Sequence, residues 1–304
     1  MTGSRSKDPL HVQKENARLR ARVLEYKASS ANARPPSAQP APAPRERIKS
    51  RFKKGPWLFF GVGIYGLAGV STYYYLSYRR AVAESQKLDV PSDVSDRYDG
   101  IARDFDEEVD ATERNLGYGK LRKELVRNAA GSVLEVSVGT GRNLEYYPLK
   151  KCRSLTFIDK SGEMINVARE KFNALHPQYS AVTFRVQDAS TPVSSAPSSG
   201  YDTIVQTMGI CSTAEPVKLL RNLGTMVNQD HGKILLLEHG KSHYRIGNRF
   251  LDSLASGHAN RYGCWWNKDI GEIVKDSGLE VISVQRYHFG TTWRFELRPK
   301  RSSN

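Results

Sequence analysis

A glycine-containing turn followed by two separated carboxylates is the part of this sequence whose residue types and spacing could do chemistry. The segment VLEVSVGTGRN places Gly139 and Gly141 directly after an apolar run. Glycines at the end of a strand let the backbone turn tightly, and the helix that follows directs free N–H groups at a ligand. Asp159 stands 24 residues after Glu135, and Asp188 lies in a short QDA segment further on. A carboxylate in the first position can accept hydrogen bonds from ribose hydroxyls, and one in the second can reach an adenine amino group. The pattern therefore predicts a nucleoside-binding site.

Two phosphate-binding motifs can be tested against this sequence, and each fails at a single position. A dinucleotide fingerprint requires Gly-x-Gly-x-x-Gly, whereas Leu144 occupies the third glycine position and would crowd a pyrophosphate. A P-loop requires Gly-x-x-x-x-Gly-Lys-Ser, and the run Gly240-Lys241-Ser242 has Leu235 in place of the first glycine. The sequence thus argues against an NAD-dependent oxidoreductase and against a P-loop.

The elements that must position these residues are strands that alternate with helices from about Tyr98 onward. Such alternation predicts an α/β fold, with a doubly wound, mostly parallel, Rossmann-like sheet of seven strands and an antiparallel strand at one edge. Ligands bind at the carboxyl ends of strands in such sheets, so the turn and both carboxylates should meet at one edge. The expected strands are 132–137, 154–158, 182–186, 201–206, 233–237, 279–289 and 291–297, and the expected helices are 162–175, 214–227 and 269–277.

The N-terminal part of the chain has a different composition. Residues 1–54 hold 14 Lys and Arg against four Asp and Glu, with five prolines in 34–44, which predicts a disordered basic tail. Residues 55–78 carry no charge and are flanked by Lys and Arg, so we expect a single transmembrane helix there. Residues 79–96 would then be a tether, and 97–304 the folded domain. The larger basic excess before the helix predicts that the tail stays on the side of insertion.

The charge and the cysteine content of the sequence exclude several kinds of function and site. Outside the tail, 32 Lys and Arg face 28 Asp and Glu, so no basic groove for nucleic acid is expected. Cys152, Cys211 and Cys264 are too few for a disulfide scaffold. Because they show no C-x-x-C spacing, they also predict no metal site.

The glycine turn and the carboxylate segments together resemble class I S-adenosylmethionine-dependent methyltransferases, most closely the quinone-methyltransferase-like branch. The resemblance covers about residues 98–297, through the segments YDGIARDFD, LEVSVGTG, FIDKSGEM, QDA and GKILLLEH. It implies S-adenosyl-L-methionine as cofactor, a lid at YDGIARDFD, and a glycine where this chain has Ser137, whose side chain would crowd the methionine end. The cofactor-binding residues that it implies are Tyr98, Glu135, Ser137, Gly139, Thr140, Gly141, Asn143, Asp159, Lys160, Met164, Asp188, Ala189 and Thr207.

Two C-terminal segments, HANRYGCWWNKD and HFGTTW, resemble membrane-anchored methyltransferase-like proteins of the fungal mitochondrial inner membrane. This resemblance implies a single-pass protein of that membrane. The charges that flank the helix then predict the tail in the matrix and the domain in the intermembrane space. The reaction would move a methyl group to an unidentified acceptor, either membrane-associated, such as a lipid-soluble quinone, or a protein. The alternative is a non-catalytic factor that supports assembly or stability of inner-membrane respiratory complexes.

A catalytic base is not identified by the sequence. His239 follows the fifth expected strand and His258 lies in the first C-terminal segment, and each is a candidate base or a structural residue. Trp265 and Trp266 either wall an acceptor pocket or close the core. Cys211 either faces the site or is a buried, inert thiol.

Overall fold

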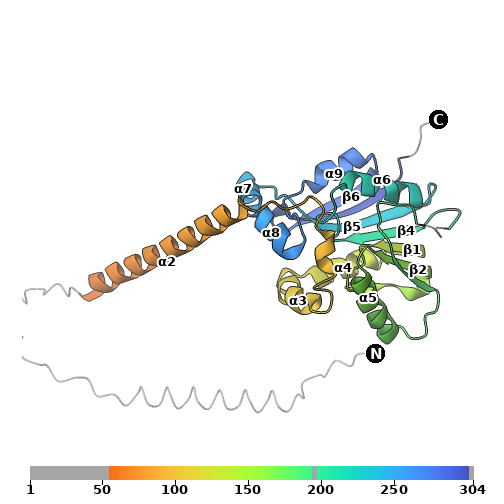
Figure 1. Cartoon of the computed structure of the whole chain (residues 1–304), viewed down its shortest axis with the longest axis horizontal. Coiled ribbons are helices and arrows are strands. Elements are labelled where there is room, and N and C mark those ends of the chain that lie inside the picture. Colours follow the sequence, from red (N-terminus) through yellow and green to blue (C-terminus); the bar gives the residue numbers. More distant parts are fainter. Residues whose placement is uncertain (1–54, 194–196, 301–304) are drawn as a thin grey trace, which may run out of the picture. The chain divides into compact units, whose positions relative to one another are not determined.

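The computed structural model describes residues 55–193 and 197–300, so the expected basic tail, 1–54, lies outside the described residues. The chain divides into two units, Met1–Gly63 and Ile64–Asn304. The second unit holds one seven-stranded sheet with helices on both faces (Figure 1). This is the predicted doubly wound α/β architecture.

The strands follow the order β3-β2-β1-β4-β5-β7-β6 across the sheet. Strands β1 to β5 run parallel, and β7 is antiparallel to both of its neighbours, β5 and β6. The predicted antiparallel pairing at one edge is confirmed, with the reversed strand β7 lying one position inside the edge strand β6. The order reverses between β1 and β4, which is where open α/β sheets bind ligands. The strands are β1 (Gly131–Val136), β2 (Cys152–Asp159), β3 (Val182–Val186), β4 (Thr203–Thr207), β5 (Lys233–His239), β6 (Glu280–Tyr287) and β7 (Thr292–Arg298).

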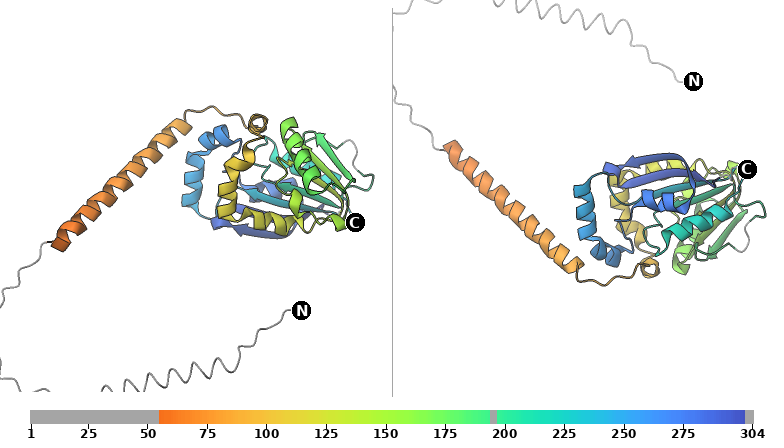
Figure 2. Two further views of the ribbon diagram at one scale, coloured as in Figure 1. Left: turned by 90° about the horizontal axis from the view of Figure 1, so that it is seen from below. Right: turned by 90° about the horizontal axis from the view of Figure 1, so that it is seen from above.

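Two apolar layers cover the two faces of the sheet. One contains Leu134 and Leu236 with leucines of α6 (Pro216–Met226) and Val274 of α9 (Ile270–Ser277). Figure 2 shows α6 and α9 together on one side of the sheet. The other layer contains Val133 and Phe157 with side chains of α4 (Tyr118–Val126) and α5 (Gly162–Leu175). Alternate residues of β1 thus enter opposite layers, as the two-residue period of a strand requires.

Local signals explain where several helices begin and end. Ser161 caps α5 by accepting a hydrogen bond from the Met164 N–H at 3.1 Å, and the helix has the predicted bounds, 162–175. Gly117 stops α3 (Phe105–Leu116) in a left-handed conformation, with φ of 68°, and α4 follows directly. The sequence did not predict α3, α4, α7 (Arg245–Ser253) or α8 (Ala255–Tyr262) as separate helices.

Helix α2 runs from Gly55 to Ser85, so residues 79–85 of the expected tether are helical. Ala, Val and Glu in this stretch allow the helix to continue past Arg79 and Arg80. Within residues 55–193 and 197–300, we find no helix that is both long and apolar enough to cross a membrane, contrary to the expectation for 55–78. The charge-free run is rich in Gly, Ser, Thr and Tyr, which lowers its hydrophobicity.

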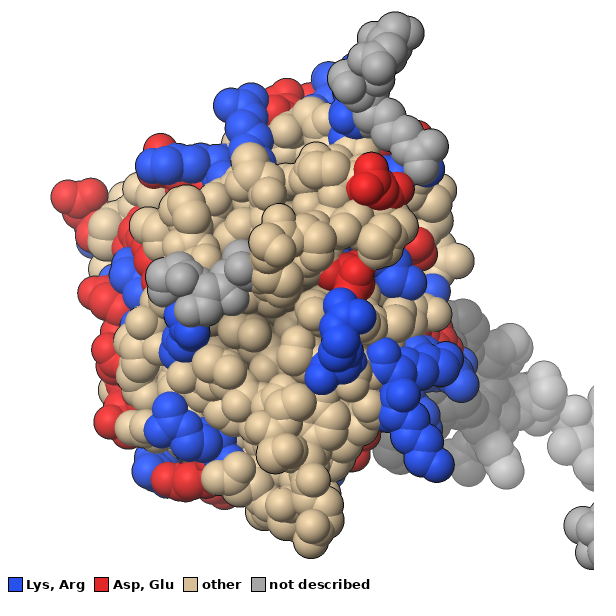
Figure 3. Space-filling model, turned by 90° about the vertical axis from the view of Figure 1, so that its right-hand side faces the viewer, with Lys and Arg blue, Asp and Glu red and all other residues tan. Residues whose placement is uncertain are grey.

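Charged side chains of both signs share the surface of the domain. On the face shown in Figure 3, Lys and Arg are interspersed with Asp and Glu around uncharged residues. This face therefore does not present a charge of a single sign.

Candidate cofactor site

A cavity lies at the carboxyl ends of β1, β2 and β4, where the strand order reverses. The glycine turn after β1, the end of β2, the QDA segment after β3 and the end of β4 each contribute to its wall. Sequence-predicted residues that line it are Tyr98, Ser137, Gly139, Thr140, Asp159, Lys160, Met164, Asp188, Ala189 and Thr207. Three predicted residues, Glu135, Gly141 and Asn143, do not line it.

Asp159 is tied to the glycine turn by backbone hydrogen bonds. Its Oδ2 accepts the N–H of Gly139 at 2.8 Å, and its Oδ1 accepts the N–H of Ser161 at 2.9 Å. Burial raises the pKa of this carboxyl above its ordinary value, although these backbone donors oppose the rise. Since a carboxylate oxygen has two lone pairs, Asp159 can hold the turn and still accept a hydrogen bond from a ligand hydroxyl.

The glycine turn leaves room for a ligand at Gly139. This residue has φ of 57°, and a Cβ placed there would meet nothing within 4 Å. Ser137, at the start of the turn, has φ of 52° and therefore adopts a left-handed conformation that favours glycine. Its side chain lies against Gly209, where an added Cβ would come within 2.7 Å of the Ser137 Cβ. The departure from the family glycine thus places a strained side chain at the cavity wall.

Glu135 and Asn143 support the turn from behind the cavity. Tyr147 donates its hydroxyl to one Glu135 oxygen at 2.6 Å, and the Asn143 amide donates to the other at 2.8 Å. Burial raises the pKa of Glu135 to about 7, and these two hydrogen bonds only partly counter that effect. Glu135 therefore holds Tyr147 and Asn143 in place beneath the turn. Its position in β1 puts its side chain on the same face of the sheet as Val133, which packs with α4 and α5.

Gly141 packs against the core and does not line the cavity. A Cβ at this position would come within 2.3 Å of Leu144 Cδ1, so the glycine lets the turn pack on the buried Leu144. Leu144, which the sequence used only to exclude a dinucleotide site, is thus a core residue.

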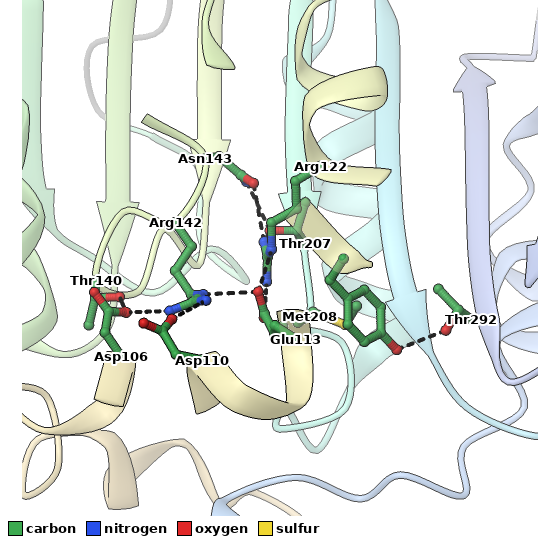
Figure 4. A network of polar contacts seen from close by, with 12 residues as sticks. Asp106, Asp110, Glu113, Arg122, Thr140, Arg142, Asn143, Thr207, Met208 and Thr292 are labelled. Carbon is green, nitrogen blue, oxygen red and sulfur yellow. Dashed lines mark hydrogen bonds and ion pairs between the residues drawn. The ribbon is translucent and has the colours of Figure 1, made fainter. Parts of the chain in front are cut away.

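Sequence reasoning missed an ionic network beneath the cavity, which Figure 4 shows. Arg122 of α4 donates to Glu113 of α3 at 2.8 Å, to Thr207 at 2.8 Å and to Asn143 at 3.1 Å. Arg142, after the glycine turn, donates to the same Glu113 carboxylate at 3.0 Å. Burial favours the neutral form of Glu113, but the two arginines outweigh it and hold its pKa below the ordinary value. Glu113 and both arginines line the cavity. Helix α3 is thus bound to the turn.

The predicted lid segment closes one side of the cavity. The Tyr98 hydroxyl donates to the Gly263 carbonyl oxygen at 3.1 Å, and the Tyr98 ring contacts Phe105 edge to face at 5.9 Å between centroids. Lys160 reaches the Ser95 hydroxyl at 3.0 Å from the end of β2. Lys160 therefore contacts the segment just before the lid.

The wall also contains apolar and amide groups suited to a flat heterocycle. Met164 and Ala189 are buried among the lining residues, as is Leu219. Asp188 accepts the Ser190 N–H at 2.7 Å, which holds the QDA turn in place. Within the described part of the chain, both polar atoms of the Gln206 amide are buried without a hydrogen-bond partner, close to Gly209 of the cavity wall. A bound polar group or water would satisfy this amide.

The residues that the sequence offers as a catalytic base, as the wall of an acceptor pocket or as a thiol facing the site do not line this cavity. His258 stacks on Trp266 with 4.0 Å between ring centroids, and the Trp265 indole N–H donates to the Pro91 carbonyl oxygen at 3.1 Å. His239 and Cys211 lie together beyond the Tyr98 side of the wall, in contact with Cys264. These side chains therefore contact other parts of the protein, outside the cofactor cavity.

Comparison with known proteins adds three findings. A family model described as a methyltransferase domain matches residues 110–284. The mitochondrial methyltransferase OMS1 of Saccharomyces cerevisiae is 39% identical over 213 residues, which are 66% of this chain and 45% of that protein. Among solved structures, the complex between the Haloferax volcanii Trm112 methyltransferase activator and the putative methyltransferase contains a similar fold, with TM-score 0.52 and 15% identity over 69% of this chain and 100% of that one. The chain spans about half the length of the curated relative.

Proposed function

Because this chain belongs to the methyltransferase domain family, we propose that the cavity between β1 and β4 binds S-adenosyl-L-methionine and that the protein transfers its methyl group to an acceptor. The observation that carries the proposal is the meeting of the glycine turn, Asp159 and Asp188 at one edge of the sheet. Three segments that are distant in the sequence thus supply a turn, a ribose acceptor and an adenine partner to one cavity.

The residues present fit the cofactor in four respects. Gly139 offers an open backbone surface, and Asp159 has lone pairs left for ribose hydroxyls. Met164 and Ala189 offer apolar contact to the adenine. The unpartnered Gln206 amide adds a donor and an acceptor close to the wall. When bound, the cofactor supplies an electrophilic methyl group, so the protein's own task is to bind and orient it and to shield it from water.

The relative also supports a proposal on the location of this chain. The yeast protein's name places it in mitochondria, and we propose the same compartment for this chain. The acceptor is either a membrane-associated compound or a protein side chain. Fractionation of cells that produce the full chain tests the compartment: co-purification with mitochondrial markers supports it, and recovery solely with cytosolic markers contradicts it.

Cofactor binding can be measured by titration calorimetry on the full chain. We expect saturable binding of S-adenosyl-L-methionine, and Asp159→Ala should weaken it by about 1.5–3 kcal/mol for each lost bond to the charged group. Glu272→Ala on α9 is the matched control, because this carboxylate pairs with Lys275 on the surface. Equal affinities of Asp159→Ala and the wild type would show that the ribose assignment is wrong.

Two observations favour the non-catalytic alternative. Among the described residues that line the cavity there is no histidine or cysteine, and the strained Ser137 takes the place of a glycine. An assembly factor with an idle site would bind cofactor yet release no S-adenosylhomocysteine when incubated with mitochondrial extract. It would also rescue a respiratory defect as well with Asp159→Ala as with the wild type, whereas an enzyme would not.

A further inference from the structure

Two cysteines and a histidine from distant parts of the chain meet beside the lid. Cys211 follows β4, His239 ends β5 and Cys264 follows α8. Their side-chain ligand atoms, two Sγ and one imidazole nitrogen, all lie within 4.8 Å of one another. Both cysteines are buried, and His239 is partly buried. The cluster therefore gathers three soft-metal ligands in a protected place.

The surrounding structure holds each ligand in position. Glu238 accepts the backbone N–H groups of Gly209 and Ile210 at 3.1 and 3.3 Å, and so fixes the loop that carries Cys211. Lys268 donates to the carbonyl oxygens of Ile210 and Thr213 in the same loop. These contacts support the cluster much as outer-shell partners support a metal site.

Further contacts fix the position of Cys264. The backbone N–H of Trp265, the next residue, donates to the Cys211 carbonyl oxygen at 3.1 Å, which joins the two cysteine segments directly. The His258 imidazole donates from Nδ1 to the Cys264 carbonyl oxygen at 2.8 Å. Because Gly263 ends α8 with φ of 66°, the chain turns sharply and brings Cys264 to the cluster.

We propose that Cys211, His239 and Cys264 bind one soft divalent cation of the zinc class. Two thiolates and a neutral imidazole balance a charge of +2, and binding releases the two thiol protons to solvent. Tetrahedral zinc with these ligands needs ligand atoms about 3.5–3.8 Å apart, which lies inside the 4.8 Å spread of the cluster. His239 Nε2 and Cys264 Sγ are 2.7 Å apart, so binding of the cation requires these two atoms to separate by about 0.8 Å.

The cluster lies next to the wall of the cofactor cavity. The Ser212 hydroxyl lies 3.6 Å from Cys211 Sγ and 3.1 Å from the Tyr98 hydroxyl. Ser212 and Tyr98 both line the cavity. Three protein ligands are the number found at zinc sites that keep an open fourth position. The cation would thus stabilise the lid-side wall of the cavity by joining two loops to the end of β5.

Cobalt(II) substitution tests the site on the full chain, purified with reducing agent and stripped of metal. We expect one equivalent of Co²⁺ to produce the absorption of a thiolate-to-cobalt charge transfer, and Zn²⁺ to remove it by displacement. Loss of an outer-shell partner weakens metal binding about 10–100-fold. Cys211→Ser and Cys264→Ser each remove a direct ligand, so each should weaken metal binding by more than that.

Cys152→Ser is the matched control, since Cys152 is the third buried cysteine but lies at the start of β2, outside the cluster. It should keep the full cobalt signal. The wild type decides the matter even if a cluster variant fails to fold: no charge-transfer absorption at one equivalent overturns the proposal, as does a signal that survives both cluster substitutions. The readout is metal binding, so it is independent of whether the cavity binds S-adenosyl-L-methionine.

Discussion

Replacement of Glu113 by glutamine should strongly destabilise the domain. The Glu113 carboxylate accepts hydrogen bonds from Arg122 at 2.8 and 3.3 Å and from Arg142 at 3.0 Å. Only 16% of the Glu113 side chain is exposed, and Arg122 is 6% exposed. Glutamine would leave two neighbouring guanidinium groups without the charge between them. Removal of one partner from a buried pair costs about 3–5 kcal/mol, and the partial exposure of Glu113 and Arg142 reduces the expected loss to about 2–4 kcal/mol.

Urea denaturation of the full chain, followed by tryptophan fluorescence, measures this loss. Glu272→Gln is the control, because Glu272 and Lys275 are 61% and 72% exposed, so solvent screens the pair and its loss should change the stability little. The pH dependence gives a second check. The pKa of Glu113 is lowered in the folded state, so its stabilisation is present at neutral pH and is lost as the pH falls below its ordinary value of 4.5. The difference between wild type and variant should shrink accordingly. A loss no larger than that of the control at pH 7 would refute the network's role.

Two further predictions concern the residues around the glycine turn. The free energy of unfolding of Ser137→Gly should exceed that of Ser137→Ala by about 1 kcal/mol, because only glycine adopts a φ of 52° without strain. Equal stabilities of the two variants in urea denaturation would contradict this strain. Burial raises the pKa of Glu135 from 4.5 to about 7, so between these pH values the folded state keeps a proton that the unfolded state has lost. The free energy of unfolding of the wild type should therefore fall by about 3 kcal/mol relative to that of Glu135→Gln as the pH rises from 4.5 to 8. Parallel stability curves of these two proteins across that range would show that Glu135 does not titrate in this way.

Much of the fold was readable from sequence because its signals are local. The helix 162–175 has its predicted bounds, since Ser161 caps it and apolar residues recur on one face. The strand at 233–237 was recognised because it is apolar throughout, although the structure extends it to His239. The helical stretch past Tyr78 was missed because charged residues were taken to end the helix, whereas they do not interrupt helical hydrogen bonding.

The sequence identifies cavity-lining residues only where the residue type and its place at the end of a strand both indicate ligand binding. Asp159 and Gly139 were found in this way, and both line the cavity. Arg122 and Glu113 were missed because they lie nine residues apart on separate helices, and only the break at Gly117 brings them together. The Cys211, His239 and Cys264 cluster was missed for the same reason, since these residues lie far apart in the sequence and no short spacing joins them.

The most direct test of the central claim is an experimental structure of the full chain with S-adenosylhomocysteine bound. We expect the ribose hydroxyls at the Asp159 carboxylate, the adenine between Met164 and Ala189, and the amino acid end over the turn at Gly139. Density for the ligand at any other place, or its absence from this cavity at saturating concentration, would contradict the account.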